Sequence, residues 1–370
     1  MSPGGKARGI WVVDLDDARW DQLGDLLVKY STDVSRGQKV LIAMSEVDAF
    51  PLVQSVYRAA VQAGAFPQVQ FLSEKLRHSV LRYGTEEQLR RVPELEAYGM
   101  EWADVYIGLR AASDPNEHSG IEASRLAMSQ AAAGKVSALR WAKTRWCLVR
   151  LPTEALAMQA GMDLAALTDI FFEACLRDWR EESQAWRRWA ENLSRASRIR
   201  IIGRETDLSF DVAGRKWVVG DGSINMPDGE IMTSPDTDSV EGGIYFERPA
   251  ILGGQFVHDM RLRWEKGHLI SASSSSNVSF LESVVESDAG AGLVGEFALG
   301  TNPSLSQFCN DPLLDEKILG TIHIALGRAY PECGGTNQSA IHWDIIKDMR
   351  TGGIVYADER PILQDGVWVG

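Results

Sequence analysis

Two histidines of this sequence stand in patterns that would suit metal binding. His342 and Asp344 flank Trp343, and residues two apart in an extended segment point to the same side. Their imidazole and carboxylate would then meet at one point, although a surface His and Asp beside a buried tryptophan give the same pattern. His323 lies in the apolar run 321–327, where a buried imidazole needs a partner for at least one nitrogen. Taken alone, this pattern is more often that of a core histidine with a hydrogen-bond partner than that of a metal ligand.

Two glutamates complete a possible ligand set. Glu296 is the only charged residue of the small, apolar run 295–300, and an ionised carboxylate seldom stays buried without a cation or donors. Glu230 follows a Pro-Asp-Gly turn, which suits a ligand or a solvated loop acid. Together with Asp344 and two imidazoles, these glutamates suffice for two divalent ions with one bridging carboxylate. Three carboxylates, two divalent ions and a hydroxide are neutral together, so the cluster can be buried.

The remaining reactive side chains have weaker patterns. His78 and His118 suit surface or structural roles, and His258 is followed by Asp259, whose side chain would point to the opposite face of a strand. The triplet 315–317, Asp-Glu-Lys, suits either a support for the site or a solvated turn. No cysteine has a neighbouring His or Asp at a telling spacing, so we expect free thiols and no thiol nucleophile. The cysteines are Cys147, Cys175, Cys309 and Cys333.

The first half of the chain alternates strand and helix patterns, which predicts an α/β domain over residues 1–197 with a doubly wound parallel sheet. No Gly-rich nucleotide motif follows any of the strands. The expected strands are 39–44, 67–72, 104–109 and 146–151. The expected helices are 50–63, 86–98, 121–133 and a connecting hairpin of 164–179 and 180–195.

After residue 197 short strands separated by turn signals predict an α+β domain, mostly antiparallel, over residues 198–370. This domain contains all five candidate ligands, so we expect it to be the catalytic, metal-binding domain. The expected strands are 201–202, 208–212, 217–219, 243–246, 256–264 and 268–273, with a helix at 278–286.

Composition narrows the class of protein. The net charge is −13 in 370 residues, and no basic stripe is visible, so a nucleic-acid partner is not expected. The hydrophobic share of 45% and the charged share of 24% are those of a globular protein. No signal-peptide pattern opens the sequence and no apolar run is long enough to span a membrane, so we expect a cytoplasmic protein.

Four sequence blocks together resemble one known family. The runs NMPDGEIMTSP (225–235), GEFALGTNP (295–303), LDEKILGTIHIALGRAYPE (314–332) and SAIHWD (339–344) resemble the aminopeptidase T and aminopeptidase S family of thermophilic-type metalloaminopeptidases. The resemblance is strong over residues 200–370, while the first half agrees in fold pattern and length. It implies a homodimer with two divalent ions (Zn, Co or Mn) per chain. It also implies the metal ligands Glu230, Glu296, His323, His342 and Asp344.

The resemblance also implies a mechanism. Members hydrolyse N-terminal residues of short peptides with water activated by the two metal ions, inside a cavity that limits substrate size. Glu296 would bridge the ions, and either Glu296 or a free carboxylate would carry a proton to the leaving amine. Tyr330, seven residues after His323, would donate to the developing oxyanion. Many members have two consecutive acids where this chain has Gly229 and Glu230. The first half also looks shorter than in the best-known members, which affects the cavity mouth.

Two alternatives use the same residues. An amide hydrolase of a small non-peptide substrate would have the same metal cluster. A related branch resembles 2,5-dihydroxypyridine ring-cleaving dioxygenases, in which Fe(II) would be held by His323, His342 and Asp344. The presence of glutamate at both 230 and 296 favours the two-metal hydrolase.

Overall fold

The structure is a computed structural model that describes residues 17–111, 117–118 and 120–369. The chain divides into two compact units, and the sequence passes between them more than once. Unit 1 consists of Met1–Met158, Met162–Leu176 and Ser223–Met226. Unit 2 consists of Gln159–Gly161, Arg177–Gly222 and Pro227–Gly370.

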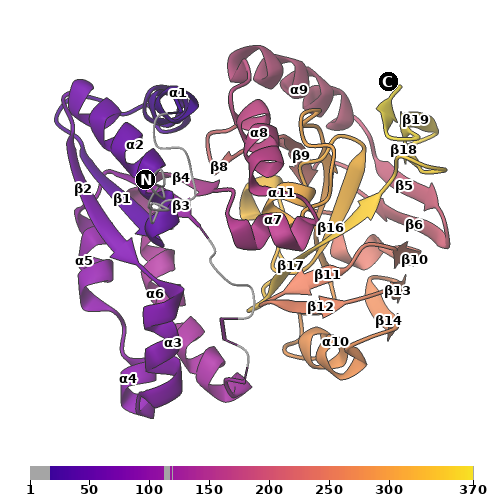
Figure 1. Cartoon of the computed structure of the whole chain (residues 1–370). Helices are drawn as coiled ribbons and strands as arrows, with labels where there is room; N and C mark the ends of the chain where they lie inside the picture. The colour runs from indigo at the N-terminus through magenta and orange to yellow at the C-terminus, as the bar shows by residue number, and fades with distance from the viewer. Residues whose placement is uncertain (1–16, 112–116, 119, 370) are drawn as a thin grey trace, which may run out of the picture. The chain divides into compact units, whose positions relative to one another are not determined.

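Unit 1 is built on a parallel five-stranded sheet with the order β2-β1-β3-β4-β8 (Figure 1). Its inner strand β1 has a run of four consecutive buried residues, as expected for a parallel strand covered on both faces. The chain winds from β1 to β2 and then back past β1 to β3, which makes the sheet doubly wound as predicted. The strands are β1 (Lys39–Ser45), β2 (Phe66–Leu72), β3 (Val105–Arg110), β4 (Arg145–Arg150) and β8 (Asn225–Met226).

Helices connect these strands, and one predicted helix is wrong. The expected helix 86–98 is two helices, α4 and α5, because Pro93 disfavours helical backbone at the residue before it. No single helix among the described residues is long and apolar enough to cross a membrane; α7 and α8 reach that standard only as a pair bent by 94°. The helices are α1 (Arg19–Leu26), α2 (Phe50–Gln62), α3 (Glu74–Tyr83), α4 (Glu86–Arg90), α5 (Glu94–Trp102), α6 (Ala123–Lys143), α7 (Glu154–Ala160) and α8 (Leu164–Cys175).

Unit 2 contains two larger antiparallel sheets, as predicted for the second half of the chain. The eight-stranded sheet has the order β14-β13-β10-β6-β5-β18-β19-β20, and the five-stranded sheet has the order β17-β16-β15-β9-β7. The first comprises β5 (Arg198–Gly203), β6 (Thr206–Asp211), β10 (Glu241–Phe246), β13 (Met260–Glu265), β14 (His268–Ser273), β18 (Ile354–Ala357), β19 (Arg360–Gln364) and β20 (Val367–Trp368). The second comprises β7 (Val218–Gly220), β9 (Glu230–Thr233), β15 (Val294–Gly300), β16 (Thr321–Gly327) and β17 (His342–Asp348).

The smaller elements of unit 2 correct a second prediction. The expected strand 256–264 is two strands of different sheets, because Asp259 has a positive φ of 52° that interrupts the extended chain. The first of these strands, β12, pairs only with β11. These elements are β11 (Ala250–Leu252), β12 (Gln255–Val257), α9 (Trp179–Leu193), α10 (Val278–Val285) and α11 (Pro312–Asp315).

The core of unit 2 contains side chains from the facing sides of its two larger sheets. Phe210 of β6 and Phe297 of β15 are fully buried, with ring centroids 5.2 Å apart. Along β16 the apolar side chains alternate with His323 and two small residues. One face of the five-stranded sheet is therefore apolar and packed, and its other face is free to carry polar groups.

The two helices expected to form one connecting hairpin belong to different units. Helix α8 is in unit 1 and α9 is in unit 2, and the chain changes units between Leu176 and Arg177. Asp178 begins α9 by accepting a hydrogen bond from the backbone N–H of Glu181. The division into an N-terminal domain of residues 1–197 and a C-terminal metal-binding domain of residues 198–370 stays a prediction.

Candidate metal centre

The strand register brings the five predicted ligands onto the polar face of the five-stranded sheet. Directly opposed residues of antiparallel strands point to the same face. Each predicted ligand is opposed by a glycine or an alanine on at least one neighbouring strand: Glu230 by Gly300, Glu296 by Ala325, His323 by Ala298, His342 by Gly327 and Asp344 by Ala325. On its other side His323 is opposed by Ile346. The glycines and alanines leave room above the sheet, so the longer ligand side chains can converge there.

The ligand atoms form two groups that share one carboxylate. The Nε2 of His323 lies 3.4 Å from Oε1 of Glu296 and 3.7 Å from Oε2 of Glu230. The Nε2 of His342 lies 3.1 Å from Oε2 of Glu296 and 3.3 Å from Oδ1 of Asp344. Ligands about 2.0–2.2 Å from a tetrahedral zinc ion are about 3.3–3.6 Å apart, so both groups fit one ion each. Glu296 contributes one oxygen to each group, as a bridging carboxylate must.

Hydrogen bonding around the second group also suits a metal ion. The Nδ1–H of His342 donates to the carbonyl of Arg328 at 2.8 Å, so Nε2 is the ring nitrogen that faces the carboxylates and could bind a metal ion. Oδ1 of Asp344 is buried and accepts no hydrogen bond from the described residues, although Nε2 of His342 lies 3.3 Å away. A buried carboxylate oxygen of this kind needs a positive partner, and a cation between the two residues supplies one.

Three further charged residues, Asp228, Glu316 and Lys317, lie beside the first group, and no sequence pattern assigned a role to Asp228. Lys317 is 1% exposed, and its Nζ lies 2.5 Å from Oε1 of Glu230 and 2.7 Å from Oε1 of Glu316. It also lies 3.7 Å from Oδ1 of Asp228. Glu316 forms a further possible ligand group with His323 and Asp344. The sequence allowed two interpretations of the triplet 315–317, a support for the site or a solvated turn. Glu316 and Lys317 are buried in the cluster, so for these two residues the solvated turn is wrong.

Burial and mutual repulsion perturb these groups. Burial raises the pKa of Glu230 to about 7 and that of Asp228 to about 6, with Lys317 opposing both shifts. Burial also works against charge on His323, but the carboxylates around it prevail and raise its pKa to about 9. Without metal, the cluster therefore draws in protons, which is the behaviour of a site that favours positive charge.

Tyr330, the predicted catalytic tyrosine, lies beside the ligand atoms. Its hydroxyl is 3.3 Å from Nε2 of His342, and burial raises its pKa, so the phenol stays a proton donor. The side chains of His342 and Asp344 are 13% and 22% exposed, whereas those of Glu230 and Glu296 are 6% and 3% exposed. The second ligand group, next to Tyr330, is therefore the accessible side of the cluster.

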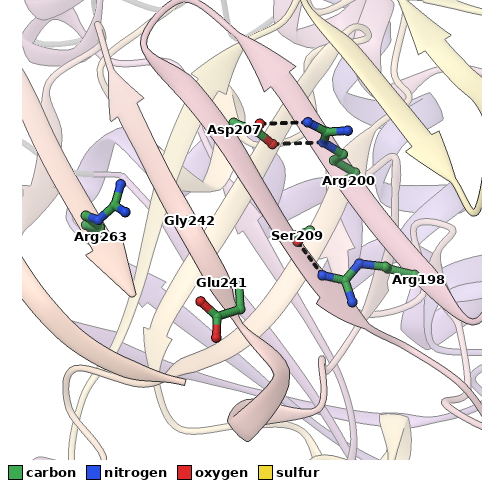
Figure 2. A pocket seen from close by; sticks show the side chains of 7 residues that line it. All are labelled: Arg198, Arg200, Asp207, Ser209, Glu241, Gly242 and Arg263. Carbon is green, nitrogen blue, oxygen red and sulfur yellow. Dashed lines mark hydrogen bonds and ion pairs between the residues drawn. The ribbon is translucent and has the colours of Figure 1, made fainter. Parts of the chain in front are cut away.

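A separate hollow of about 460 Å³ lies over the eight-stranded sheet (Figure 2). Two of its arginines already have acidic partners: Arg200 makes two hydrogen bonds to Asp207, and Arg198 pairs with Asp211. These side chains are about half exposed and include none of the predicted ligands. We therefore place the chemistry on the five-stranded sheet.

Comparison with known proteins identifies the family. The family model described as thermophilic metalloprotease (M29) matches residues 16–368. The chain belongs to the M29 metalloprotease family. Aminopeptidase 2 of Geobacillus stearothermophilus is 25% identical over 410 residues, covering 95% of this chain and 98% of that protein. This membership confirms the resemblance and the hydrolase class predicted from the sequence blocks.

Two solved structures share the fold. Wild-type AmpT from Thermus thermophilus has a TM-score of 0.84 at 23% identity, covering 95% of this chain and 99% of that chain. The 2,5-dihydroxypyridine dioxygenase from Pseudomonas putida KT2440 has a TM-score of 0.65 at 15% identity, covering 97% and 98%. The M29 fold is thus shared with a protein named for different chemistry, so the choice of reaction depends on the ligand set.

Proposed function

We propose that this M29 protein is a metal-dependent aminopeptidase that removes N-terminal residues from short peptides with two divalent ions, Zn, Co or Mn. The observation that carries the proposal is the pair of ligand groups that share Glu296, with spacings that suit one ion each. The name of the Geobacillus stearothermophilus relative, an aminopeptidase, supports the choice of substrate.

Charge balance supports two ions. The cluster contains five carboxylates and one ammonium, a formal charge of −4, which two divalent ions match. Burial of an unbalanced charge is costly, so a neutral cluster is the stable form. The carboxylates are those of Asp228, Glu230, Glu296, Glu316 and Asp344.

Each residue has a distinct role in the proposed reaction. When bound, the ions polarise the scissile carbonyl and lower the pKa of a water molecule towards neutrality. Glu296 would hold the two ligand groups together, and either Glu296 or a free carboxylate of the cluster would pass the proton of the attacking water to the leaving amine. Tyr330 donates its O–H to the oxyanion that develops on the substrate carbonyl. The α-amino group of the substrate binds on the accessible side, beside Asp344.

The variant Glu296→Gln tests the proposal. It keeps the shape of the side chain but removes the shared charge, so we expect kcat/KM for an aminoacyl anilide to fall about 1000-fold or more. We also expect fewer than two ions per chain by metal analysis. The exposed Glu282→Gln on α10 is the matched control and should behave as wild type. An active Glu296→Gln protein without bound metal would contradict the assignment.

A blocked substrate tests the aminopeptidase step itself. We expect an N-acetylated anilide to be hydrolysed at least 100-fold more slowly than the free amine, because the α-amino group is part of recognition. Equal rates would favour the small-amide alternative.

The dioxygenase alternative predicts one Fe per chain instead of two Zn or Co. It is not favoured, because each of the two ligand groups contains a glutamate.

Two further expectations, a homodimer from the family resemblance and a cytoplasmic location from the sequence pattern, stay predictions. A homodimer is expected, and size-exclusion chromatography with light scattering would measure it. A cytoplasmic location is expected, and fractionation of the source cells would test it.

A further inference from the structure

Lys317 is a buried ammonium inside a cluster that otherwise suits metal ions. It lies between Glu230 and Glu316, at 2.5 and 2.7 Å, and both carboxylates belong to possible ligand groups. A lysine with 1% exposure is rare unless carboxylates compensate its charge. Lys317 therefore already occupies part of the space and charge balance that cations would fill.

The backbone holds this lysine in place. The carbonyl of Lys317 accepts a hydrogen bond from the N–H of Asn302 at 2.9 Å, and its own N–H donates to Leu314. The side-chain amide of Asn302 in turn donates to the carbonyl of Asp228 at 2.7 Å. Asn302 thus ties the segment that contains Lys317 to the turn that precedes Glu230, and the ammonium has little freedom to leave.

The contact with Glu230 places the ammonium next to one of the two ion positions. Oε1 of Glu230 faces Lys317, while its Oε2 faces Nε2 of His323. Among the described residues, no ion pair joins a lysine or arginine to His342, Asp344 or Glu296. An ion held with Glu230 is therefore repelled by a nearby ammonium, and an ion held with Asp344 is repelled less.

We propose that Lys317 stands in for metal charge in the metal-free protein and makes the ion position at Glu230, Glu296 and His323 the weaker of the two. This inference rests on the proposed metal centre. Its consequence is ordered loading: the position at Glu296, His342 and Asp344 fills first, and the position beside Lys317 exchanges more readily.

A thermodynamic cycle gives the sign of the effect. Removal of the ammonium takes the formal charge of the buried cluster from −4 to −5 in the metal-free protein, whereas two divalent ions leave only −1 in the loaded protein. The substitution therefore destabilises the metal-free form more than the loaded form, so it must tighten metal binding. Loss of an ordinary packing residue would destabilise both forms equally and leave the affinity unchanged.

The experiment is a Zn²⁺ titration of the full-length, metal-free protein against a chromophoric chelator, with melting temperatures measured with and without Zn²⁺. In the wild type we expect two sites whose Kd values differ at least tenfold. In Lys317→Met the weaker Kd should tighten at least tenfold, and the melting temperature should fall more without zinc than with it. Lys317→Gln repeats the test if the methionine variant does not fold.

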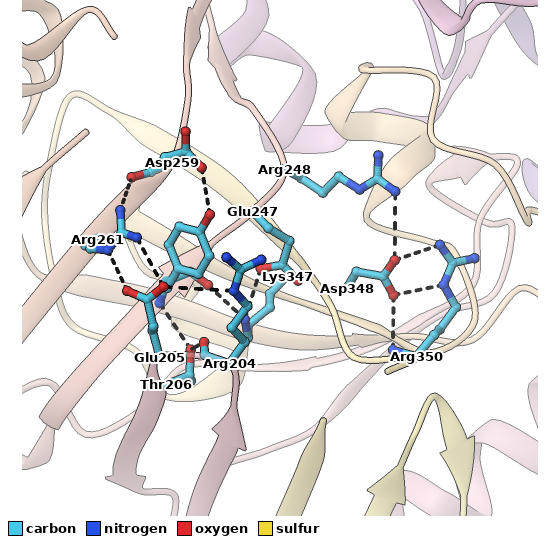
Figure 3. A network of polar contacts seen from close by, with 11 residues as sticks. Arg204, Glu205, Thr206, Glu247, Arg248, Asp259, Arg261, Lys347, Asp348 and Arg350 are labelled. Carbon is cyan, nitrogen blue, oxygen red and sulfur yellow. Dashed lines mark hydrogen bonds and ion pairs between the residues drawn. The ribbon is translucent and has the colours of Figure 1, made fainter. Parts of the chain in front are cut away.

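Lys347→Met is the matched control. Lys347 is equally buried on β17, but its Nζ contacts the carbonyl of Tyr245 and Glu247, away from the ligands (Figure 3). Its replacement should lower both melting temperatures alike and leave both Kd values unchanged.

The possible failures are distinguishable. An unchanged or weaker Kd in the Lys317 variants would overturn this inference while leaving the aminopeptidase proposal in place. A wild-type protein that binds no divalent ion would overturn both.

Discussion

The substitution Gly220→Ala tests how closely the strands position Glu230. Gly220 ends β7 and pairs with Glu230 in the register of the sheet. A Cβ at residue 220 would lie 2.9 Å from Cγ of Glu230 and 3.0 Å from Cγ of Asp228, and it would overlap a carboxylate oxygen of Asp228. Gly220 does not have a positive φ, so the backbone itself accepts alanine. The effect of the change therefore falls on the two acidic side chains.

The size of the effect follows from these contacts. Carbon atoms pack about 3.5–4.0 Å apart, so Glu230 must move by about 0.6–1 Å. Catalytic groups must be held to within about 0.5 Å, and a misplacement of about 1 Å costs about 100-fold in rate. We expect kcat/KM to fall about 100-fold, or about 2.7 kcal/mol of transition-state stabilisation.

The assay is hydrolysis of an aminoacyl anilide at saturating Zn²⁺ or Co²⁺, with near-ultraviolet circular dichroism to check the fold. Gly243→Ala is the control, since its Cβ would meet its nearest neighbour, a carbonyl oxygen, at an ordinary 3.4 Å. It should stay within threefold of wild type. If Gly220→Ala also kept wild-type activity and both ions, the position of Glu230 would not matter to catalysis.

Three further predictions address other parts of the molecule. Tyr330→Phe should lower kcat about 100-fold with little change in KM or metal content, and an unchanged kcat would exclude the oxyanion role. Chelation should abolish activity and lower the melting temperature, with recovery on adding Zn²⁺ or Co²⁺. Asp348→Asn should destabilise the protein by about 1–3 kcal/mol at pH 7, because Arg350 makes two side-chain hydrogen bonds to Asp348 (Figure 3). Burial favours the neutral acid, but Arg350 prevails and lowers the pKa of Asp348. The stabilisation of the wild type by ionised Asp348 is present above the pKa of about 3.9 that this group has in the unfolded chain. It disappears as the pH falls through the lower pKa of Asp348 in the folded protein, which urea titrations can follow.

Local patterns predicted the parts of the site that lie on single strands. The spacing of His342 and Asp344 has the period of a strand, and both side chains do lie on one face of β17. The apolar run around His323 is strand β16, with the imidazole buried as expected. These predictions succeeded because alternation along a strand is set by the backbone and needs no tertiary information.

The predictions failed where one residue interrupts a longer pattern or where distant segments meet. Pro93 divides an otherwise continuous helical pattern into two helices. The left-handed backbone of Asp259 separates two strands that the sequence pattern predicted as one. The contact between Lys317 and Glu230 joins residues 87 positions apart, and sequence spacing contains no sign of it. A lysine beside carboxylates also fits a solvated turn, so only its burial distinguishes the two interpretations.

The structure gives a physical reason for the glycine that precedes Glu230. Gly229 has a φ of 128°, and a Cβ there would lie 2.7 Å from Cβ of Asn302 and 3.0 Å from its backbone nitrogen. An acidic side chain at residue 229 would not fit while Asn302 holds the turn to Lys317. The chain thus lacks a negative charge at residue 229 and has a positive one at residue 317, next to the same ion position. Lys317 therefore lowers the negative charge beside this ion position, and Gly229 leaves the space for the Asn302 contact that holds Lys317 there, which supports the proposed order of loading.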